Sequence, residues 1–457
     1  MPENPYVPVI PICNVIHDDK AGYCRKEHEY EIYLPSRTIL QVSGSSGFGK
    51  GVRNAPATNL SDLLRYQNML CRYDTVALKS LDIFSVHGFP VGLIQCESNM
   101  LGIMDPGSSQ CIGSGGWANI IEKFRKAKIY CDNPFEIRHN GRRKDIVHIP
   151  DEWIGDESKD HDPVKKRNVR MLCEDAAQVD LPQSSLDAVF TDPPYFGNVQ
   201  YAELMDFCYV WLRRLMNADV PAFSNRSTRS QRELTGNEDM GRGLDHFSQG
   251  LSSVFQKMAD ALKPGTPLVF TYHHNDLAAY YPIAVGVLDA GLTCSGSLPC
   301  PAEMGASIHI NGTGSSIIDT VFICRSTGSF PRKWIVDSIE GVAGLVNDDL
   351  ERLRAGSVNP TPGDMRCIAY GHLIRLAIWN LRTTWDKNKD IQTRLATVSS
   401  WLAKFGGWND IERRLPDYDE PFRRRTIRSR SESRESSRSQ GSALILLTGS
   451  LLPLRLI

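Results

Sequence analysis

The chain has 457 residues, of which 41% are hydrophobic and 23% charged, a composition typical of a soluble globular protein of two or three domains. Its 52 Lys and Arg residues balance 53 Asp and Glu residues, so any surface that binds nucleic-acid phosphates must be local. The 12 cysteines contain no C-x-x-C pair, which argues against a zinc ribbon and against a dense disulfide framework.

The composition also bears on where the protein works. Residues 1–11 have no basic stretch followed by an apolar one, so the sequence predicts no signal peptide. No apolar run reaches the ~18 residues that a membrane span requires. Together with singly placed cysteines, these features predict a cytoplasmic protein with reduced thiols and no membrane partner.

The N-terminal third of the chain carries the weaker patterns. Residues 1–60 are poorly patterned, and their glycine-rich stretch Ser43–Gly51 lacks the G-x-x-x-x-G-K-[ST] spacing of a phosphate-binding loop. Residues 61–168 form a predicted accessory region. Its expected elements are a helix over Asp62–Tyr73, strands over Ile83–Val86 and Val91–Cys96, a helix over Trp117–Tyr130, and a polar connector over 137–168.

Strands and helices alternate over residues 169–326, which predicts the catalytic core. The expected strands are Val169–Cys173, Leu186–Thr191, Pro267–Tyr272, Leu292–Leu298 and Ile317–Cys324. The expected helices are Tyr201–Met216, Leu244–Leu262 and Leu277–Ala290. Because strands separated by helices of this length usually run parallel, the sequence predicts an α/β fold with a largely parallel sheet.

The C-terminal quarter divides into two predicted parts. Residues 327–415 have the apolar spacing of a helical region. Residues 416–457 include a stretch rich in Arg, Ser and Glu that has almost no apolar side chains, so this tail is predicted to be disordered.

One tetrapeptide, Asp192-Pro193-Pro194-Tyr195, directly follows the apolar strand Leu186–Thr191. In open α/β sheets, ligands bind beyond the carboxyl ends of the strands. The exocyclic amino group of a nucleobase is a weak nucleophile, because its lone pair is delocalised into the ring. Two acceptors aimed at its N–H bonds favour the pyramidal nitrogen that attacks a methyl group.

Each residue of the motif has a predicted role in that chemistry. The Asp192 carboxylate is expected to accept one N–H, and the carbonyl of Pro193 the other. Pro194 pushes Pro193 towards an extended conformation, so that this carbonyl is fixed with little entropy left to lose. Tyr195 offers an aromatic face for stacking. A target base in a duplex must be flipped out or already unpaired to reach these groups.

A second acidic residue, Asp175, lies just beyond the strand expected over Val169–Cys173. An acid at this place can accept a hydrogen bond from the adenine amino group of a cofactor. Acids after strands are common, so the prediction depends on the spacing between Asp175 and Asp192.

The run from Leu186 to Arg214, with the tetrapeptide near its start, resembles the large adenine-specific DNA methylases of bacteria and archaea. These amino-methyltransferases carry a D-P-P-Y motif, begin with a domain of unknown function and often contain a zinc ribbon. Lys263-Pro264-Gly265 and the segment Gly305–Cys324 also resemble this family. The resemblance covers about residues 170–325.

The resemblance implies a Rossmann-like methyltransferase fold, S-adenosylmethionine as methyl donor and DNA as substrate, in restriction–modification or phage defence. It implies that Asp192, Pro193, Pro194 and Tyr195 form the catalytic motif and that Asp175 binds the cofactor adenine.

The sequence departs from the family in its cofactor loop. Family members carry a D-P-F-x-G-x-G run between a strand and a helix, and this chain has no good copy of it. The nearest segment, Leu101–Gly107 with Gly113–Gly116 before the helix at Trp117, is interpreted as a surface loop. These departures predict the C-terminal part of a longer enzyme, with a sheet incomplete at its N-terminal strands. Another chain that supplies those strands would then be needed for good cofactor binding.

Other polar residues are weaker candidates. His273 and His274 follow a predicted strand and are expected to line the same site as Asp192, with too few neighbouring ligands for a metal. Glu303 and His309–Asn311 flank a glycine-rich stretch and are weak candidates for substrate contact.

The leading hypothesis is methylation of adenine N6 in DNA. Two acceptors and an aromatic ring suit any planar amino group, so cytosine N4, amino groups of RNA bases and the amide of protein glutamine stay open. The missing glycine loop keeps a non-catalytic subunit or remnant of such an enzyme open as well.

Overall fold

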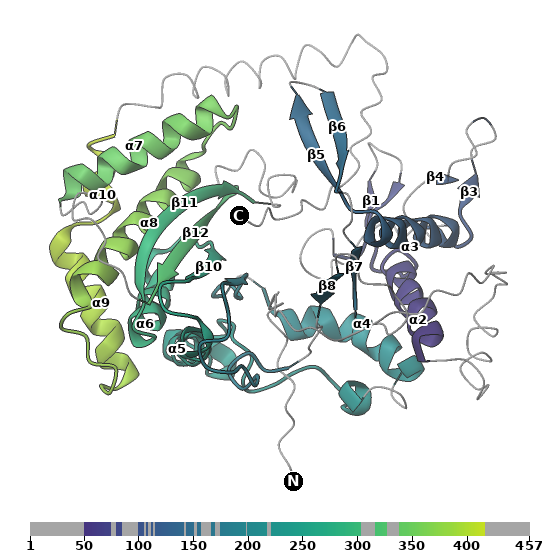
Figure 1. The fold of residues 1–457 in the computed structure, drawn as a ribbon, viewed down its shortest axis with the longest axis horizontal. Helices are drawn as coiled ribbons and strands as arrows, with labels where there is room; N and C mark the ends of the chain where they lie inside the picture. The colour runs from purple at the N-terminus through teal and green to yellow at the C-terminus, as the bar shows by residue number, and fades with distance from the viewer. Residues whose placement is uncertain are drawn as a thin grey trace.

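The computed structural model describes residues 50–74, 79–84, 99–104, 107, 111–112, 115–140, 143–149, 153–156, 166–169, 174–197, 199–216, 221–302, 316–326 and 338–415. The tail over 416–457, the strand expected over Val91–Cys96, and the candidates Glu303 and His309–Asn311 lie outside these residues. Figure 1 shows a central sheet with helices on one side, and a group of shorter elements beyond α4 (Tyr201–Met216).

The central sheet has the strand order β11-β12-β10-β9. Its strands are β9 (Val189–Thr191), β10 (Pro267–Tyr272), β11 (Thr293–Pro301) and β12 (Ile318–Arg325). β9 and β10 run parallel, whereas β12 is antiparallel to both β10 and β11. The chain is therefore a mixed α/β protein with a mixed sheet.

The prediction of a largely parallel sheet is wrong for the pairs that involve β12. Parallel neighbours need a crossover of about a dozen residues or more, usually a helix. The sequence pattern shows no helix between β11 and β12, so this part of the chain gave no support for parallel pairing. The boundaries of β10 were predicted correctly, and β9 was predicted three residues too long.

One face of the sheet is packed against helices. The rings of Phe270 and Phe322 stack across β10 and β12 with centroids 5.2 Å apart, and Phe255 of α5 (Leu244–Ala261) lies 4.8 Å from Phe270. α6 (Tyr281–Asp289) packs against α5, and α8 (Pro362–Leu381) lies over β11 and β12. Gly371 permits this approach, because a Cβ atom there would lie 2.5 Å from Ser297 Oγ.

The helices after the sheet are α7 (Ile339–Ala355), α8, α9 (Ile391–Phe405) and α10 (Trp408–Glu412). The helical content expected for this region is therefore present in residues 338–415. α8 begins with a capping box between Thr361 and Asp364, and Asp364 also accepts hydrogen bonds from Ser316 Oγ and Ile317 N. The start of α8 is thereby fixed to the residues that lead into β12.

The described residues of the N-terminal part form two helices and short strand pairs. The helices are α2 (Lys50–Leu64) and α3 (Trp117–Asp132). The pairs are β1 (Tyr73–Asp74) with β2 (Lys79–Ser80), β3 (Ile103–Met104) with β4 (Cys111–Ile112), β5 (Phe135–Asn140) with β6 (Arg143–His148), and β7 (Trp153–Asp156) with β8 (Lys166–Val169). α2 contacts both α3 and α4 (Figure 1).

Two predictions for this part are wrong. The helix expected over Asp62–Tyr73 ends at Leu64, because the Asn68 side chain donates to the carbonyls of Leu64 and Arg65 and turns the chain. The connector expected over 137–168 contains the β5–β6 hairpin. The side chains of β6 are largely exposed, so its sequence lacks the apolar alternation by which a strand is recognised.

The helix predicted over Trp117–Tyr130 is confirmed as α3. Ile83 and Phe84, expected to begin a strand, lie in a turn, and residues 85 and 86 are outside the described part. Of the strand expected over Val169–Cys173, only Val169 is described, as the last residue of β8.

Within the described part of the chain, none of the helices combines the length and the apolar character needed to cross a bilayer.

Candidate functional site

Asp192 lies directly after β9, beside the end of β10. The register pairs Thr191 with Phe270, so Asp192 and Thr271 follow on the same face of the sheet. The hydroxyl of Thr271 donates to Asp192 Oδ1, and the hydroxyl of Tyr195 donates to the same oxygen over 3.2 Å. Asp192 is exposed, and among the described residues no donor bonds to its Oδ2.

The prolines of the motif anchor it. Pro193 is buried and Pro194 half-buried, so the backbone on either side of the Pro193 carbonyl is held by packing as well as by the proline rings. In the part of the chain that is described, no hydrogen bond involves this carbonyl. The motif therefore presents two acceptors without a described donor, Asp192 Oδ2 and the Pro193 oxygen.

The side chain of Tyr195 packs against residues at the end of β10. Its ring meets that of Tyr272 edge to face at 5.4 Å and lies 6.4 Å from that of His273. Burial, and then the charges of Asp319 and Asp192, raise the pKa of Tyr195 far above its usual value. The phenol is therefore protonated at any physiological pH and acts as a hydrogen-bond donor to Asp192.

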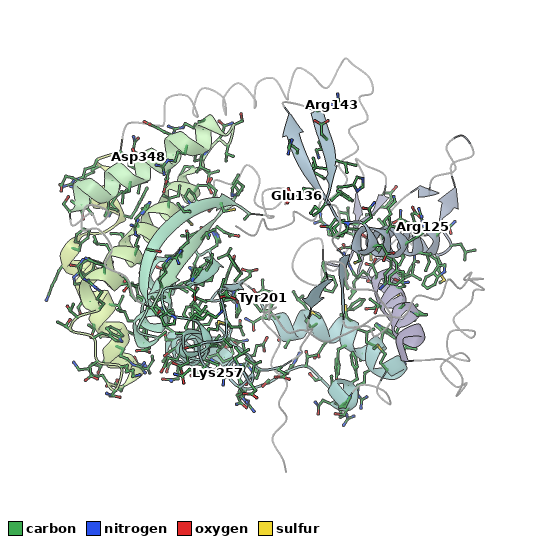
Figure 2. All side chains as sticks on the ribbon, viewed as in Figure 1. Arg125, Glu136, Arg143, Tyr201, Lys257 and Asp348 are labelled. Carbon is green, nitrogen blue, oxygen red and sulfur yellow. The ribbon has the colours of Figure 1, made fainter. Side chains whose placement is uncertain are left out.

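Tyr201, the first residue of α4, is a further aromatic side chain at the site that the motif alone did not single out. Figure 2 shows it at the end of α4 that faces the sheet. Burial raises the pKa of its hydroxyl, a hydrogen bond with the backbone of Tyr195 lowers it, and the charge of Asp192 raises it further. The signal in the sequence was an aromatic residue at the first position of the helix that follows Asp192-Pro193-Pro194-Tyr195.

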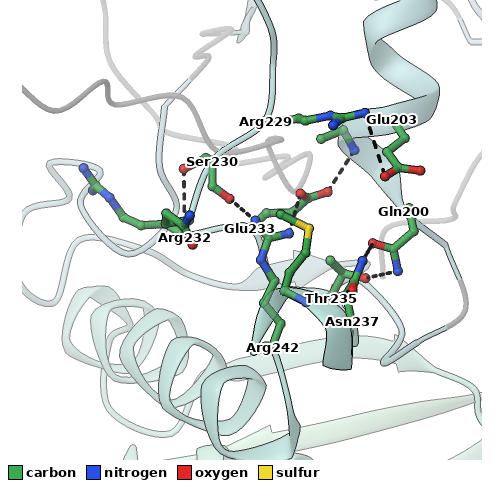
Figure 3. Close-up of polar contacts among 12 residues, drawn as sticks. Gln200, Glu203, Arg229, Ser230, Arg232, Glu233, Thr235, Asn237 and Arg242 are labelled. Atoms are coloured by element: carbon green, nitrogen blue, oxygen red, sulfur yellow. Dashed lines mark hydrogen bonds and ion pairs between the residues drawn. The ribbon is translucent and has the colours of Figure 1, made fainter.

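The segment between α4 and α5 is held against the first turn of α4. Glu233 accepts a hydrogen bond from the backbone N–H of Ala202 over 2.8 Å and forms an ion pair with Arg242 over 2.9 Å (Figure 3). Both charged side chains are buried. A carboxylate at a helix N-terminus is favourable because it faces unpaired N–H groups. Glu233 thereby fixes where α4, and with it Tyr201, begins.

A second set of contacts extends this network to Gln200, just before α4. Its amide donates to Thr235 Oγ1 over 3.2 Å and to the carbonyl of Gly236 over 2.9 Å (Figure 3). Asn237 donates back to Gln200 Oε1 over 3.1 Å. The loop after the motif and the segment before α5 are therefore one hydrogen-bonded unit.

Gly236 allows this segment to reach the backbone after the motif. A Cβ atom at this position would lie 2.8 Å from the nitrogen of Gly197 and 2.9 Å from the ring of Phe196. Gly197 itself has φ of +70°, a conformation that favours glycine. The close approach of these two glycines sets how near the segment lies to Tyr195.

Replacing Gly236 with alanine is expected to lower the free energy of unfolding by about 1–3 kcal/mol, because the added methyl group overlaps backbone atoms. Gly344→Ala is the matched control, since a Cβ atom there meets nothing within 4 Å and alanine favours helix α7. Urea unfolding followed by circular dichroism measures both. Equal stability of Gly236→Ala and the wild type would show that the segment moves aside at no cost.

His273 and His274 follow β10, as predicted, and lie beside the motif. The ring of His274 is 6.4 Å from that of Phe196, and His273 Nδ1 lies 3.1 Å from the carbonyl oxygen of Ile318. Burial lowers the pKa of both imidazoles. They are therefore neutral at neutral pH and can hydrogen-bond without adding charge beside Asp192.

Acidification is expected to destabilise the fold through these two histidines. Their pKa is lower in the folded than in the unfolded chain, so the unfolded chain binds more protons as the pH falls below about 6.5. Stability that is present above this pH is then lost. Urea midpoints at pH 7.5 and 5.5 test this, and His273→Asn should lose less over the interval. An equal loss in variant and wild type would contradict the assignment.

Asp175, the predicted ligand of a cofactor adenine, is held by two contacts. Its Oδ1 accepts from the backbone N–H of Ala177 over 2.9 Å, and its Oδ2 forms an ion pair of 2.9 Å with Arg232. Arg232 belongs to the same segment as Glu233 (Figure 3). Neither of these contacts involves Asp192. They link Asp175 to the motif indirectly, through the segment between α4 and α5 to which Arg232 belongs.

The glycines considered as a cofactor loop serve packing in the described residues. A Cβ atom at Gly116 would lie 2.5 Å from the Cα of Gly102, and one at Gly115 would meet the side chain of Tyr66. The N–H groups of Trp117 and Ala118, at the start of α3, donate to backbone carbonyls over 2.7 and 3.2 Å. These two N–H groups are therefore not directed at an anionic ligand.

Among the described residues, no group of three His, Cys, Asp or Glu side chains is arranged to hold a metal ion. Comparison of the chain with protein-family models, curated proteins and solved structures finds no match.

Proposed function

We propose that the protein is an S-adenosylmethionine-dependent methyltransferase that modifies an exocyclic amino group in DNA, with adenine N6 as its target. The proposal depends on one observation, which is that two hydrogen-bond acceptors of the motif have no donor among the described residues. Asp192 Oδ2 and the Pro193 oxygen come from adjacent residues at the carboxyl end of β9, and neither meets a donor in the described part of the structure. An amino group has two N–H bonds, one for each acceptor.

The motif residues would act on that amino group directly. By accepting both N–H bonds, Asp192 and Pro193 favour a pyramidal nitrogen whose lone pair is free to form a bond to carbon. The proton lost when the new N–C bond forms leaves toward the Asp192 carboxylate or through it to water. Tyr195 holds the carboxylate through its hydroxyl.

S-adenosylmethionine, when bound, would supply the methyl group from a sulfonium whose sulfur keeps the electrons of the broken S–C bond. Asp175 fits the predicted contact to the cofactor adenine only in part. Its carboxylate has acceptor capacity left beyond Ala177 and Arg232, because an ionised carboxylate accepts about four hydrogen bonds. The amides of Trp117 and Ala118 at the start of α3 are already paired, so they are not available to a cofactor.

A second candidate function follows from that last observation. If the rest of the cofactor site comes from another chain, the protein is one subunit of the methyltransferase and carries the amino-group acceptors alone. The two candidates differ in what the isolated chain binds, which calorimetry with S-adenosylmethionine measures.

The test is transfer of labelled methyl groups from S-adenosylmethionine to duplex and single-stranded DNA by the purified chain. Nucleoside analysis of the product separates N6-methyladenine from N4-methylcytosine, and RNA and glutamine-containing protein serve as alternative acceptors. We expect label in N6-methyladenine. Binding of S-adenosylmethionine without transfer to any acceptor would contradict the proposal.

A further inference from the structure

The end of β10 carries a residue that neither the motif nor the histidines beside it account for. Thr271 is opposite Asp192 in the parallel register of β9 and β10, and its hydroxyl donates to Asp192 Oδ1. We propose that Thr271 is a positioning residue, which turns the Asp192 carboxylate so that Oδ2 alone faces the substrate amino group. This inference rests on the proposed function and names how that same site is oriented.

The geometry of the two donors favours this role. Thr271 and Tyr195 approach one and the same oxygen of Asp192 from different elements, β10 and the loop after β9. A carboxylate with both donors on Oδ1 resists rotation about its Cβ–Cγ bond, because rotation would break both hydrogen bonds together. Hydrogen bonds to an ionised group are stronger than those between neutral groups, which adds to this resistance.

The choice of threonine fits the same role. A β-branched side chain in a strand is restricted at χ1, so the Thr271 hydroxyl loses little freedom when it bonds to Asp192. Its alternation within β10 places it on the face opposite Phe270 and Tyr272, away from the helix-packed core. Burial of Tyr195 keeps the second donor protonated, since its pKa is raised far above the usual value.

In this proposal, Oδ1 of Asp192 fixes the orientation of the carboxylate, and Oδ2 accepts the hydrogen bond from the substrate amino group. If Thr271 acts in this way, its loss should slow the chemical step and leave substrate binding nearly unchanged. A misplaced catalytic group costs up to about 100-fold in rate even when the displacement is near 1 Å.

The test uses Thr271→Val and Thr271→Ser in the full chain. Valine keeps the shape and suits a strand, whereas serine restores the hydroxyl. Thr293→Val is the matched control, a half-buried threonine of β11 whose hydroxyl has no described partner. We expect kcat of Thr271→Val to fall about 10- to 100-fold with KM unchanged, and Thr271→Ser to stay within about threefold of the wild type.

A readout without catalysis separates this inference from the proposed function. In carbon-13 NMR, the Asp192 carboxyl signal, assigned with Asp192→Asn, should shift in Thr271→Val and return in Thr271→Ser. An unchanged signal in Thr271→Val would overturn the inference whether or not the protein transfers methyl groups. Equal loss of kcat in the valine and serine variants would also overturn it. Absence of transfer by the wild type, with the expected NMR shifts, would instead contradict the proposed function alone.

Discussion

Replacing Asp192 with alanine is expected to abolish methyl transfer, with kcat at least about 1,000-fold below that of the wild type. The substitution removes the acceptor on one N–H bond and the only carboxylate of the motif. It also leaves the hydroxyls of Thr271 and Tyr195 without their shared acceptor. Because these two donors lose their acceptor, the free energy of unfolding should fall by about 1–3 kcal/mol, which leaves the protein folded for the assay.

Asparagine at the same position sharpens the test. Its amide oxygen would turn toward the two hydroxyl donors that now meet Oδ1, and its NH₂ group would then face the substrate. A donor opposite an amino group repels it, so Asp192→Asn should be as inactive as Asp192→Ala.

The matched control is Asp187→Ala, five residues earlier, where the side chain is 65% exposed and pairs with Lys263 at the surface. Transfer of labelled methyl groups under single-turnover conditions compares the three variants with the wild type. Activity of Asp192→Ala within about tenfold of the control would exclude the carboxylate from the chemistry.

Glu233→Ala should destabilise the protein more than any surface substitution, by about 3–5 kcal/mol, because it leaves the Arg242 guanidinium buried without its counter-charge. The N–H of Ala202 loses its acceptor at the same time. The segment between α4 and α5 then loses one of its attachments to α4, whereas the hydrogen bonds of Ser227 and Thr228 to Asp206 remain, so methyl transfer should fall with stability. Urea unfolding and activity at a temperature where both proteins are folded measure the two effects.

Two further variants test whether the unpaired charge of Arg242 causes the loss of stability in Glu233→Ala. The double variant Glu233→Leu with Arg242→Met removes both charges together, and it should be more stable than Glu233→Ala, since removal of a whole buried pair is often tolerated. Glu203→Ala, in which a half-exposed carboxylate loses a 3.9 Å contact to Arg229, should change stability by less than about 0.5 kcal/mol. A double variant less stable than Glu233→Ala would show that packing, and not the unpaired charge, dominates.

The sequence predicted the elements around the site closely, and the reason is physical. The alternation in β10 matches its burial, and the helical spacing of apolar residues gave the bounds of α4, although Met205, Val210 and Trp211 of that helix are exposed. The position of Asp192 after a strand also followed from the pattern of Leu186–Thr191.

The contacts that orient the site were not predictable in this way. Thr271 meets Asp192 only because β9 and β10 are neighbours in one register, and strand order is not encoded in either strand alone. The pairing of Glu233 with Arg242 likewise depends on a loop whose polar residues carry no periodic signal. Short-range sequence patterns therefore predicted the helices and strands. The contacts between residues of different elements depend on tertiary packing, which these patterns do not contain.

The shortness of β9 has a consequence for how the site behaves in time. This strand has three residues, and in the described chain it is paired with β10 alone, at one end of the sheet. Few hydrogen bonds must break for such a strand to detach, whereas β12 is held from both sides. We therefore expect transient local opening to dismantle the acceptor pair long before the helices around α8 unfold, so that a bound nucleotide or cofactor would lengthen the lifetime of the assembled site.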